Sequence, residues 1–128
     1  MRHQKNRLLE LNTWIKKKEV FIKTQLSSLI KNGKLTTTSK RAKVLKAHAD
    51  AFFSKLLQTS QNYKDEKDAK RECIRLVKTM VAGEDTGKMV LATLLPKYQA
   101  SKQQSFVADY KVGYRVWDAS AKIMLKLL

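Results

Sequence analysis

One short motif contains residues that could perform acid-base catalysis. Asp85-Thr86-Gly87 has the Asp-Thr-Gly order of aspartic proteases, in which two carboxylates share a proton. In those enzymes the motif ends an apolar strand, whereas Gly83 and Glu84 precede it in this chain. We therefore interpret the segment as a helix-capping loop rather than as half of a catalytic pair.

Residues 83–88 also have a partial likeness to a phosphate-binding loop, whose glycine amides cradle a nucleotide. Three residues separate Gly83 from Gly87, where the motif requires four. Met89 occupies the position at which Ser or Thr must bind magnesium. The spacing and the missing hydroxyl exclude a nucleotide-binding loop of this type.

Metal and nucleophile chemistry have few candidate residues. His3 and His48 have no His, Cys or acidic neighbours at the spacing of metal ligands. Cys73 is the only cysteine, so an internal disulfide is impossible and a reducing compartment is favoured. It falls in an apolar helical stripe, which favours a small buried hydrophobe over a nucleophile. We expect no enzyme, no metal, no cofactor and no small-molecule substrate.

Phosphate binding is the chemistry that the composition favours. The 128 residues include 27 Lys and Arg against 11 Asp and Glu, a net charge of +16. Residues 1–46 hold 13 of the basic and two of the acidic residues. Self-repulsion at this charge disfavours a compact chain unless a polyanion binds it. Nucleic acid is the favoured polyanion, because neutralising its phosphates releases condensed counterions.

One junction concentrates the positive charge. Lys31 and Lys34 flank Gly33, and the cluster Lys40-Arg41 with Lys43 opens the next predicted helix. Cations at a helix N-terminus oppose the helix dipole. A phosphate held between the two groups, contacting exposed backbone N–H groups as well, would remove that conflict.

Helical periodicity predicts the elements that position these residues. Apolar spacing predicts helices over residues 13–31, 39–58, 65–82 and 86–95, with Ser39 capping the second and Pro96 ending or kinking the fourth. The strongest pattern lies in the second helix, where apolar residues recur in steps of three and four. This predicted core stripe comprises Ala42, Leu45, Ala49, Phe52 and Leu56.

Strand patterns complete the predicted fold. Residues 34–38 suit a short strand, and alternation in 106–112 and 121–127 predicts a hairpin with one buried face. The expected buried residues are Phe106, Ala108, Tyr110, Val112, Ala121, Ile123, Leu125 and Leu127.

The resulting fold class is α+β, in two layers of order α-β-α(3)-β(2), with helices on one face of a small mixed sheet. We expect a basic arm over residues 1–13, with a frayed terminus as the alternative, and one globular domain over 14–128. No apolar run is long enough to span a membrane, and the N-terminus lacks the apolar stretch of a secretory signal. We expect an intracellular protein.

A family resemblance agrees with this order. The segment Leu29-Ile30-Lys31-Asn32-Gly33-Lys34-Leu35-Thr36-Thr37-Thr38, followed by Ala42-Lys43 and Leu45, resembles the pattern L-I-x-x-x-x-I-x-T-T-x-x-K-A-K-E-L of protein 17 of the bacterial large ribosomal subunit. Leu95-Pro96-Lys97-Tyr98 is similar to its A-P-R-Y, and Arg115 with Asp118-Ala119 is similar to its R-R-G-D-A-A. The resemblance covers most of the chain.

Three departures from the family pattern indicate a divergent lineage or an organellar protein. Residues 103–107 replace the family's G-G-Y-T-R, residues 8–13 replace its basic G-R-x-L-N-R, and Trp117 replaces the glycine of R-G-D.

The resemblance implies a structural constituent of the large subunit, in a cytoplasmic or organellar ribosome. Its implied partners are large-subunit ribosomal RNA and neighbouring ribosomal proteins near the exit-tunnel side, with no membrane contact. Together with the basic pattern, the resemblance predicts an RNA-binding set of Arg2, His3, Lys5, Arg7, Lys16, Lys17, Lys18, Lys23, Lys31, Lys34, Lys40, Arg41, Lys43 and Arg115.

Alternative functions differ in their partners. A DNA-binding architectural protein would need a recognition helix or a dimeric design, and neither is evident. A basic membrane-surface or partner-binding module is the other alternative, and an RNA-directed enzyme lacks an acid-base pair. Four aromatic residues are candidates for base stacking or protein contact, although core packing is the safer interpretation of each: Trp14, Tyr63, Tyr114 and Trp117.

Overall fold

A computed structural model of the chain describes residues 15–128, with side chains from Lys17 onward. The expected arm over residues 1–13, with Arg2, His3, Lys5 and Arg7, lies outside the described residues, as do Trp14 and the side chain of Lys16. The described elements follow the order α1 (Ile15–Asn32), β1 (Lys34–Thr38), α2 (Ser39–Asn62), α3 (Glu66–Met80), α4 (Glu84–Met89), η2 (Val90–Leu94), α5 (Leu95–Ser101), β2 (Val107–Tyr114) and β3 (Ala121–Leu127).

The sheet has the strand order β1-β3-β2, and both strand pairs are antiparallel. The α+β class and the predicted pairing of the last two strands are therefore confirmed. The expectation of a mixed sheet is wrong, because β3 runs back between β1 and β2. Leu125 is paired with Leu35 on one side and with Asp109 on the other.

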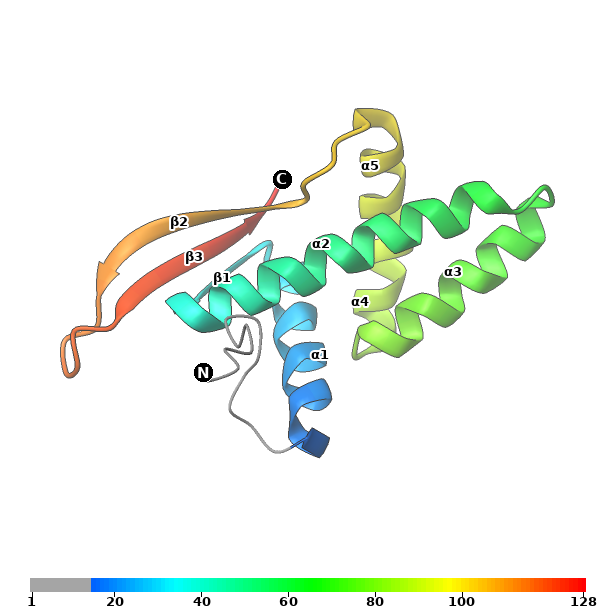
Figure 1. Ribbon diagram of the computed structural model, residues 1–128. Coiled ribbons are helices and arrows are strands. Elements are labelled where there is room, and N and C mark those ends of the chain that lie inside the picture. Colours follow the sequence, from blue (N-terminus) through cyan, green and yellow to red (C-terminus); the bar gives the residue numbers. More distant parts are fainter. Residues whose placement is uncertain (1–14) are drawn as a thin grey trace, which may run out of the picture.

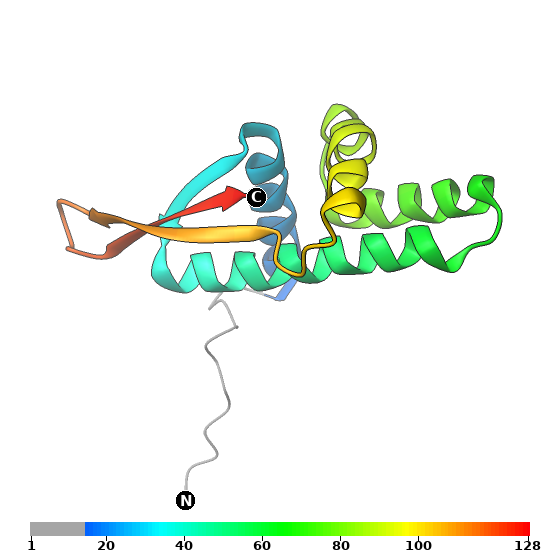
Figure 2. The ribbon, with the colours of Figure 1, turned by 90° about the horizontal axis from the view of Figure 1, so that it is seen from above.

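Helix α2 connects the two halves of the molecule (Figure 1). Its 24 residues span about 36 Å at the usual helical rise. The early part of α2 and helix α1 pack on one face of the sheet, and α3 lies antiparallel to its later part (Figure 2). The predicted core stripe from Ala42 to Leu56 is buried throughout, which confirms the orientation of this helix.

Four aromatic rings join α2, α5 and the start of β2. Phe53 lies 5.0 Å from Tyr98 and 5.6 Å from Phe106, measured between ring centroids, and Phe52 adjoins this group. The backbone N–H of Phe106 donates to Asp50 Oδ1 at 2.9 Å. Tilted and edge-on contacts of this kind stabilise a core beyond the apolar area they bury. The cluster therefore fixes where the chain enters the sheet after its last helix.

The helix containing Pro96 continues beyond it to Ser101, so of the two predicted effects, ending the helix is wrong. Residues Val90–Leu94 form a wide π turn, in which Leu95 N–H bonds to Val90 O. Pro96 then falls in the first turn of α5, which extends to Ser101. Proline cannot donate the N–H that a continuous helix uses, and the π turn directly before Pro96 accommodates that loss. One continuous helical segment, α4-η2-α5, thus stands where a shorter helix was expected.

Two further predictions need correction. Thr38, not Ser39, is the N-cap residue of α2, and no side-chain hydrogen bond caps the helix there. The predicted buried face of the hairpin is correct for β3, where Ile123 and Leu125 are buried, but it is wrong for β2, where Val107 is buried instead. Ala108 and Tyr110 pair with Lys126 and Met124 on the face away from the helices, and Val112 lies at a register shift, so Tyr110 and Val112 are about half exposed.

Candidate nucleic-acid interface

The predicted lysines of α1 lie on several sides of the helix. Its buried face consists of Ile22, Leu26, Leu29 and Ile30. Lys17 and Lys31 are exposed, whereas Lys18 is half-buried. The lysines therefore do not form a single patch.

Lys23 already has an intramolecular partner. Its Nζ donates to Lys78 O at 3.3 Å, in the last turn of α3. A cation near a helix C-terminus is stabilised by the helix dipole. Lys23 thus helps to hold α1 against α3, a function that its position in the sequence did not reveal.

A small group of residues, the α1–α2 seam, joins these two helices. It comprises Lys18 and Phe21 of α1 with Arg41 and His48 of α2. The Arg41 guanidinium carbon lies 5.2 Å from the centre of the Phe21 ring. Burial lowers the pKa of His48, and the positive charge of Lys18 lowers it further. His48 was not predicted as a binding residue, although it lies two helical turns from Arg41.

The start of α2 carries the expected charge conflict. Lys40 and Arg41 lie in its first turn, which contains no acidic residue. Strand β1, however, separates these cations from Lys31 and Lys34. Four steps of extended backbone correspond to about 13 Å. One phosphate held between the two groups is therefore a poor description, and two separate contact points fit the geometry better.

The outer face of the sheet contains cations that the sequence interpretation missed. Leu125 and Ile123 of β3 are buried toward the helices, so Lys122, Met124 and Lys126 point to the other side. Lys126 is paired with Lys34, and Met124 with Thr36 and Tyr110. This outer sheet face is defined by Lys34, Thr36, Thr38, Tyr110, Lys122, Met124 and Lys126. The strict alternation in β3 could have identified its two lysines.

Arg115 is the predicted RNA-binding residue with the clearest intramolecular role. Its guanidinium forms an ion pair with Asp118 and lies 4.4 Å from the Trp117 ring centre. Burial alone would raise the pKa of Asp118, but hydrogen bonds from Arg115 and Ser120 outweigh it and lower that pKa. Arg115 therefore stabilises the loop between β2 and β3 instead of presenting a free cation.

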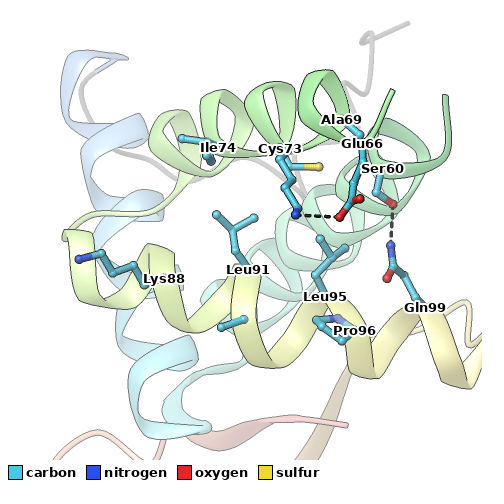
Figure 3. A pocket seen from close by; sticks show the side chains of 12 residues that line it. Ser60, Glu66, Ala69, Cys73, Ile74, Lys88, Leu91, Leu95, Pro96 and Gln99 are labelled. Carbon is cyan, nitrogen blue, oxygen red and sulfur yellow. Dashed lines mark hydrogen bonds and ion pairs between the residues drawn. The ribbon is translucent and has the colours of Figure 1, made fainter. Parts of the chain in front are cut away.

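A groove of about 700 Å³ lies between α3 and the α4-η2-α5 segment (Figure 3). Its floor is mainly apolar and includes Cys73 and Leu91. Burial raises the pKa of the Cys73 thiol, which disfavours the nucleophilic thiolate and fits the interpretation of a buried hydrophobe. At the rim, Lys70 is paired with Glu66 at 2.7 Å. Both residues belong to α3, so this pair stabilises one wall of the groove and does not bridge the two.

Two negative findings apply to the described residues. Among residues 15–128, no group of three His, Cys, Asp or Glu side chains is placed to hold a metal ion. In the same part of the chain, no helix combines the length and the apolar character needed to cross a membrane.

The fold and its charge define a small basic α+β protein that presents cations from two helices and from the open face of a sheet. Comparison with known families identifies the family to which this protein belongs. The sequence model described as ribosomal protein L17 matches residues 21–128. The chain therefore belongs to the ribosomal protein L17 family, a family of structural ribosomal proteins, and the resemblance noted from the sequence is confirmed.

Two relatives show how far the chain has diverged. It is 27% identical over 111 residues to the large ribosomal subunit protein bL17 of Desulforamulus reducens, covering 87% of this chain and 89% of the relative. It is also 27% identical over 107 residues to the protein of the same name in Clostridium tetani, covering 84% of this chain and 85% of that relative. Near-complete coverage at modest identity is what a divergent family member should give.

Proposed function

We propose that this protein is a structural constituent of the large ribosomal subunit that binds and stabilises its ribosomal RNA. The proposal combines family membership with one structural observation. Within residues 17–128, only one predicted RNA-binding cation forms an ion pair, namely Arg115. The remaining predicted cations in this range form no ion pair: Lys17, Lys18, Lys23, Lys31, Lys34, Lys40, Arg41 and Lys43.

Among the described residues, the acids that form ion pairs mostly pair with cations outside the predicted RNA-binding set. Glu66, Glu72 and Glu84 pair with basic residues within α3 and α4, and Asp109 pairs with Lys46. The positive charge of α1, of the start of α2 and of the outer sheet face is left for an external anion. Phosphates of folded RNA would supply that anion, and recognition would be mainly of backbone and shape.

Three surfaces share this binding in our proposal. Lys17, Lys18, Arg41 and His48 contact phosphates along the α1–α2 seam and beside it. The outer sheet face offers Lys34, Lys122 and Lys126, with Tyr110 able to stack on a base. The basic residues Arg2, His3, Lys5 and Arg7, with Lys16, extend the contact along the RNA.

The partners and location follow from the same proposal. We place the protein in a ribosome, beside neighbouring large-subunit proteins near the exit-tunnel side. The bacterial relatives favour a cytoplasmic ribosome over an organellar one.

Sedimentation tests the assignment to the large subunit. A tagged full-length chain expressed in its own cells should co-sediment with large subunits in a sucrose gradient. It should be released by high salt, because the contacts with phosphate are electrostatic. Recovery only in the free-protein fractions, or with membranes, would overturn the proposal.

The outer sheet face can be tested with a charge-matched pair of variants. We expect the Lys122→Gln and Lys126→Gln double variant to bind large-subunit RNA more weakly and to fold normally. The control is Lys70→Gln with Lys88→Gln, which removes the same charge from α3 and α4, where both lysines are paired with acids. Filter binding measures the affinity, and thermal melting measures the stability of the fold. Equal losses of affinity would show that net charge alone decides binding.

A further inference from the structure

The end of the β2–β3 hairpin exposes an unusual amount of apolar surface. We define the hairpin tip as residues 112–121. Tyr114 is 73% exposed, Val116 100% and Trp117 78%, so core packing is the wrong interpretation of both aromatic residues. The hairpin carries them away from the helices (Figures 1 and 2). Contiguous exposed apolar side chains of this kind mark interaction surfaces.

The hairpin tip is nevertheless well ordered internally. Asp118 accepts hydrogen bonds from Arg115 Nε at 3.0 Å, from Ser120 N at 3.1 Å and from Ser120 Oγ at 3.0 Å. Arg115 N–H donates to Ser120 O at 2.8 Å, and Ala119 N–H donates to Arg115 O at 3.0 Å. A loop that is already fixed gives up little conformational entropy when it binds. The tip is therefore organised to present Val116 and Trp117.

Its charge differs from that of the rest of the molecule. The chain has a net charge of +16, yet the tip contains only Arg115 and Asp118 as charged residues. These two neutralise each other in an ion pair. Two donor nitrogens of Arg115, Nε and Nη2, are already bonded to Asp118, so this guanidinium offers a phosphate a neutralised charge and few remaining donors. The tip is thus neutral and apolar on a strongly basic protein, which disfavours RNA as its binding partner.

The exposed side chains themselves favour a protein partner. Burying a valine and an aromatic side chain in an apolar pocket removes their apolar surface from water, which favours association. RNA offers base faces that could stack on Trp117, but it offers no apolar pocket for Val116. Tryptophan, tyrosine and arginine are also the residues that most often dominate protein–protein binding.

We propose that the hairpin tip docks into an apolar pocket of a neighbouring protein in the large subunit, with Trp117 as the anchor and Val116 beside it. Arg115 and Asp118 act as positioning residues that hold this anchor in place. The inference rests on the proposed function and specifies the protein contact made by this part of the chain.

Photocross-linking in assembled subunits tests the proposal directly. Benzoylphenylalanine replaces Trp117 in the full-length chain, and purified large subunits carrying it are irradiated. We expect an adduct that resists nuclease and contains one defined ribosomal protein, cross-linked at a peptide rich in apolar residues. An adduct to ribosomal RNA would overturn the proposal in favour of base stacking, and the absence of any adduct would show a solvent-exposed tip.

A second measurement covers the case in which the cross-linking variant is not incorporated. Val116→Ser with Trp117→Ser leaves the Arg115–Asp118 pair intact. We expect its retention on salt-washed large subunits to fall about tenfold or more, as for loss of an aromatic anchor. Its affinity for isolated RNA should stay at the wild-type value. An equal loss in both assays, or in neither, would overturn the proposal. Failure of the wild-type chain to sediment with large subunits would instead contradict the proposed function.

Discussion

Asp118 controls the conformation of the hairpin tip through a single carboxylate. Its hydrogen bonds with Arg115 and Ser120 require the ionised form, and they lower its pKa below the ordinary value of 3.8. A carboxyl group with a lowered pKa stabilises the folded tip above its unfolded pKa. That stabilisation is lost as the pH falls through the lower, folded pKa.

The expected acid transition can be observed at Trp117. With Trp14 replaced by Phe, Trp117 is the only tryptophan, and its fluorescence should stay constant as the pH falls through 3.8. Its emission should change only at lower pH, when Asp118 is protonated and Arg115 leaves the ring. The matched Asp118→Asn variant should lack this step. A transition centred above 3.8 in the parent would contradict the stabilising role of the pair.

Individual cations show the limit of prediction from composition. Lys23 and Arg115 resemble the other basic residues in sequence, yet one is bonded to the end of α3 and the other to Asp118. These roles depend on contacts between distant segments or within an irregular loop, which periodicity does not describe. Lys122 and Lys126, by contrast, alternate with the buried Ile123 and Leu125. Their position on the outer sheet face was predictable once β3 had been placed in a sheet.

Elements with strong periodicity were predicted well. The buried stripe of α2 and the existence of all three strands are confirmed. Errors occurred where backbone geometry overrode the local sequence signal. A π turn accommodates Pro96, and the polar residues after Gln58 continue α2 as far as Asn62. The distance between Lys34 and Lys40 could have been predicted from the length of β1, by treating that strand as fully extended backbone.

The first turn of α2 provides a test at the scale of the element. Lys40 is the second residue of α2, where the dipole disfavours a cation. Lys40→Glu should therefore stabilise the isolated protein by about 0.3–1 kcal/mol in denaturant unfolding. The same substitution should weaken RNA binding, because a predicted phosphate contact becomes an acid. Lys40 is preferable to Arg41 for this test, since Arg41 also packs on Phe21.

Lys67 offers a closely matched control. It is the second residue of α3, and Lys67→Glu makes the same change in net charge at the same helical position. Both variants should be stabilised, but only Lys40→Glu should lose affinity beyond the general electrostatic effect. If both lose the same affinity, the start of α2 is not part of the RNA-binding surface.

The whole molecule should bind RNA with a steep dependence on salt. If its cations neutralise on the order of six phosphates, affinity should fall about a thousandfold between 50 and 200 mM salt. Removing Lys122 and Lys126 should reduce the slope of log affinity against log salt by about two. Filter binding across a salt series measures both quantities. A flat response in the parent would contradict binding through phosphates.

The position of β3 in the middle of the sheet also determines how the protein can fold during its own synthesis. Of the elements in this sequence, β3 is translated last, yet β1 has its only described strand partner in β3. The contacts among α1, α2 and the α3–α5 segment can form while translation continues, because all their residues precede β2. Strand β1 must wait with an unpaired edge until residues 121–127 emerge. A nascent chain therefore carries a helical core with an incomplete sheet, and such an exposed edge favours aggregation until the last strand inserts.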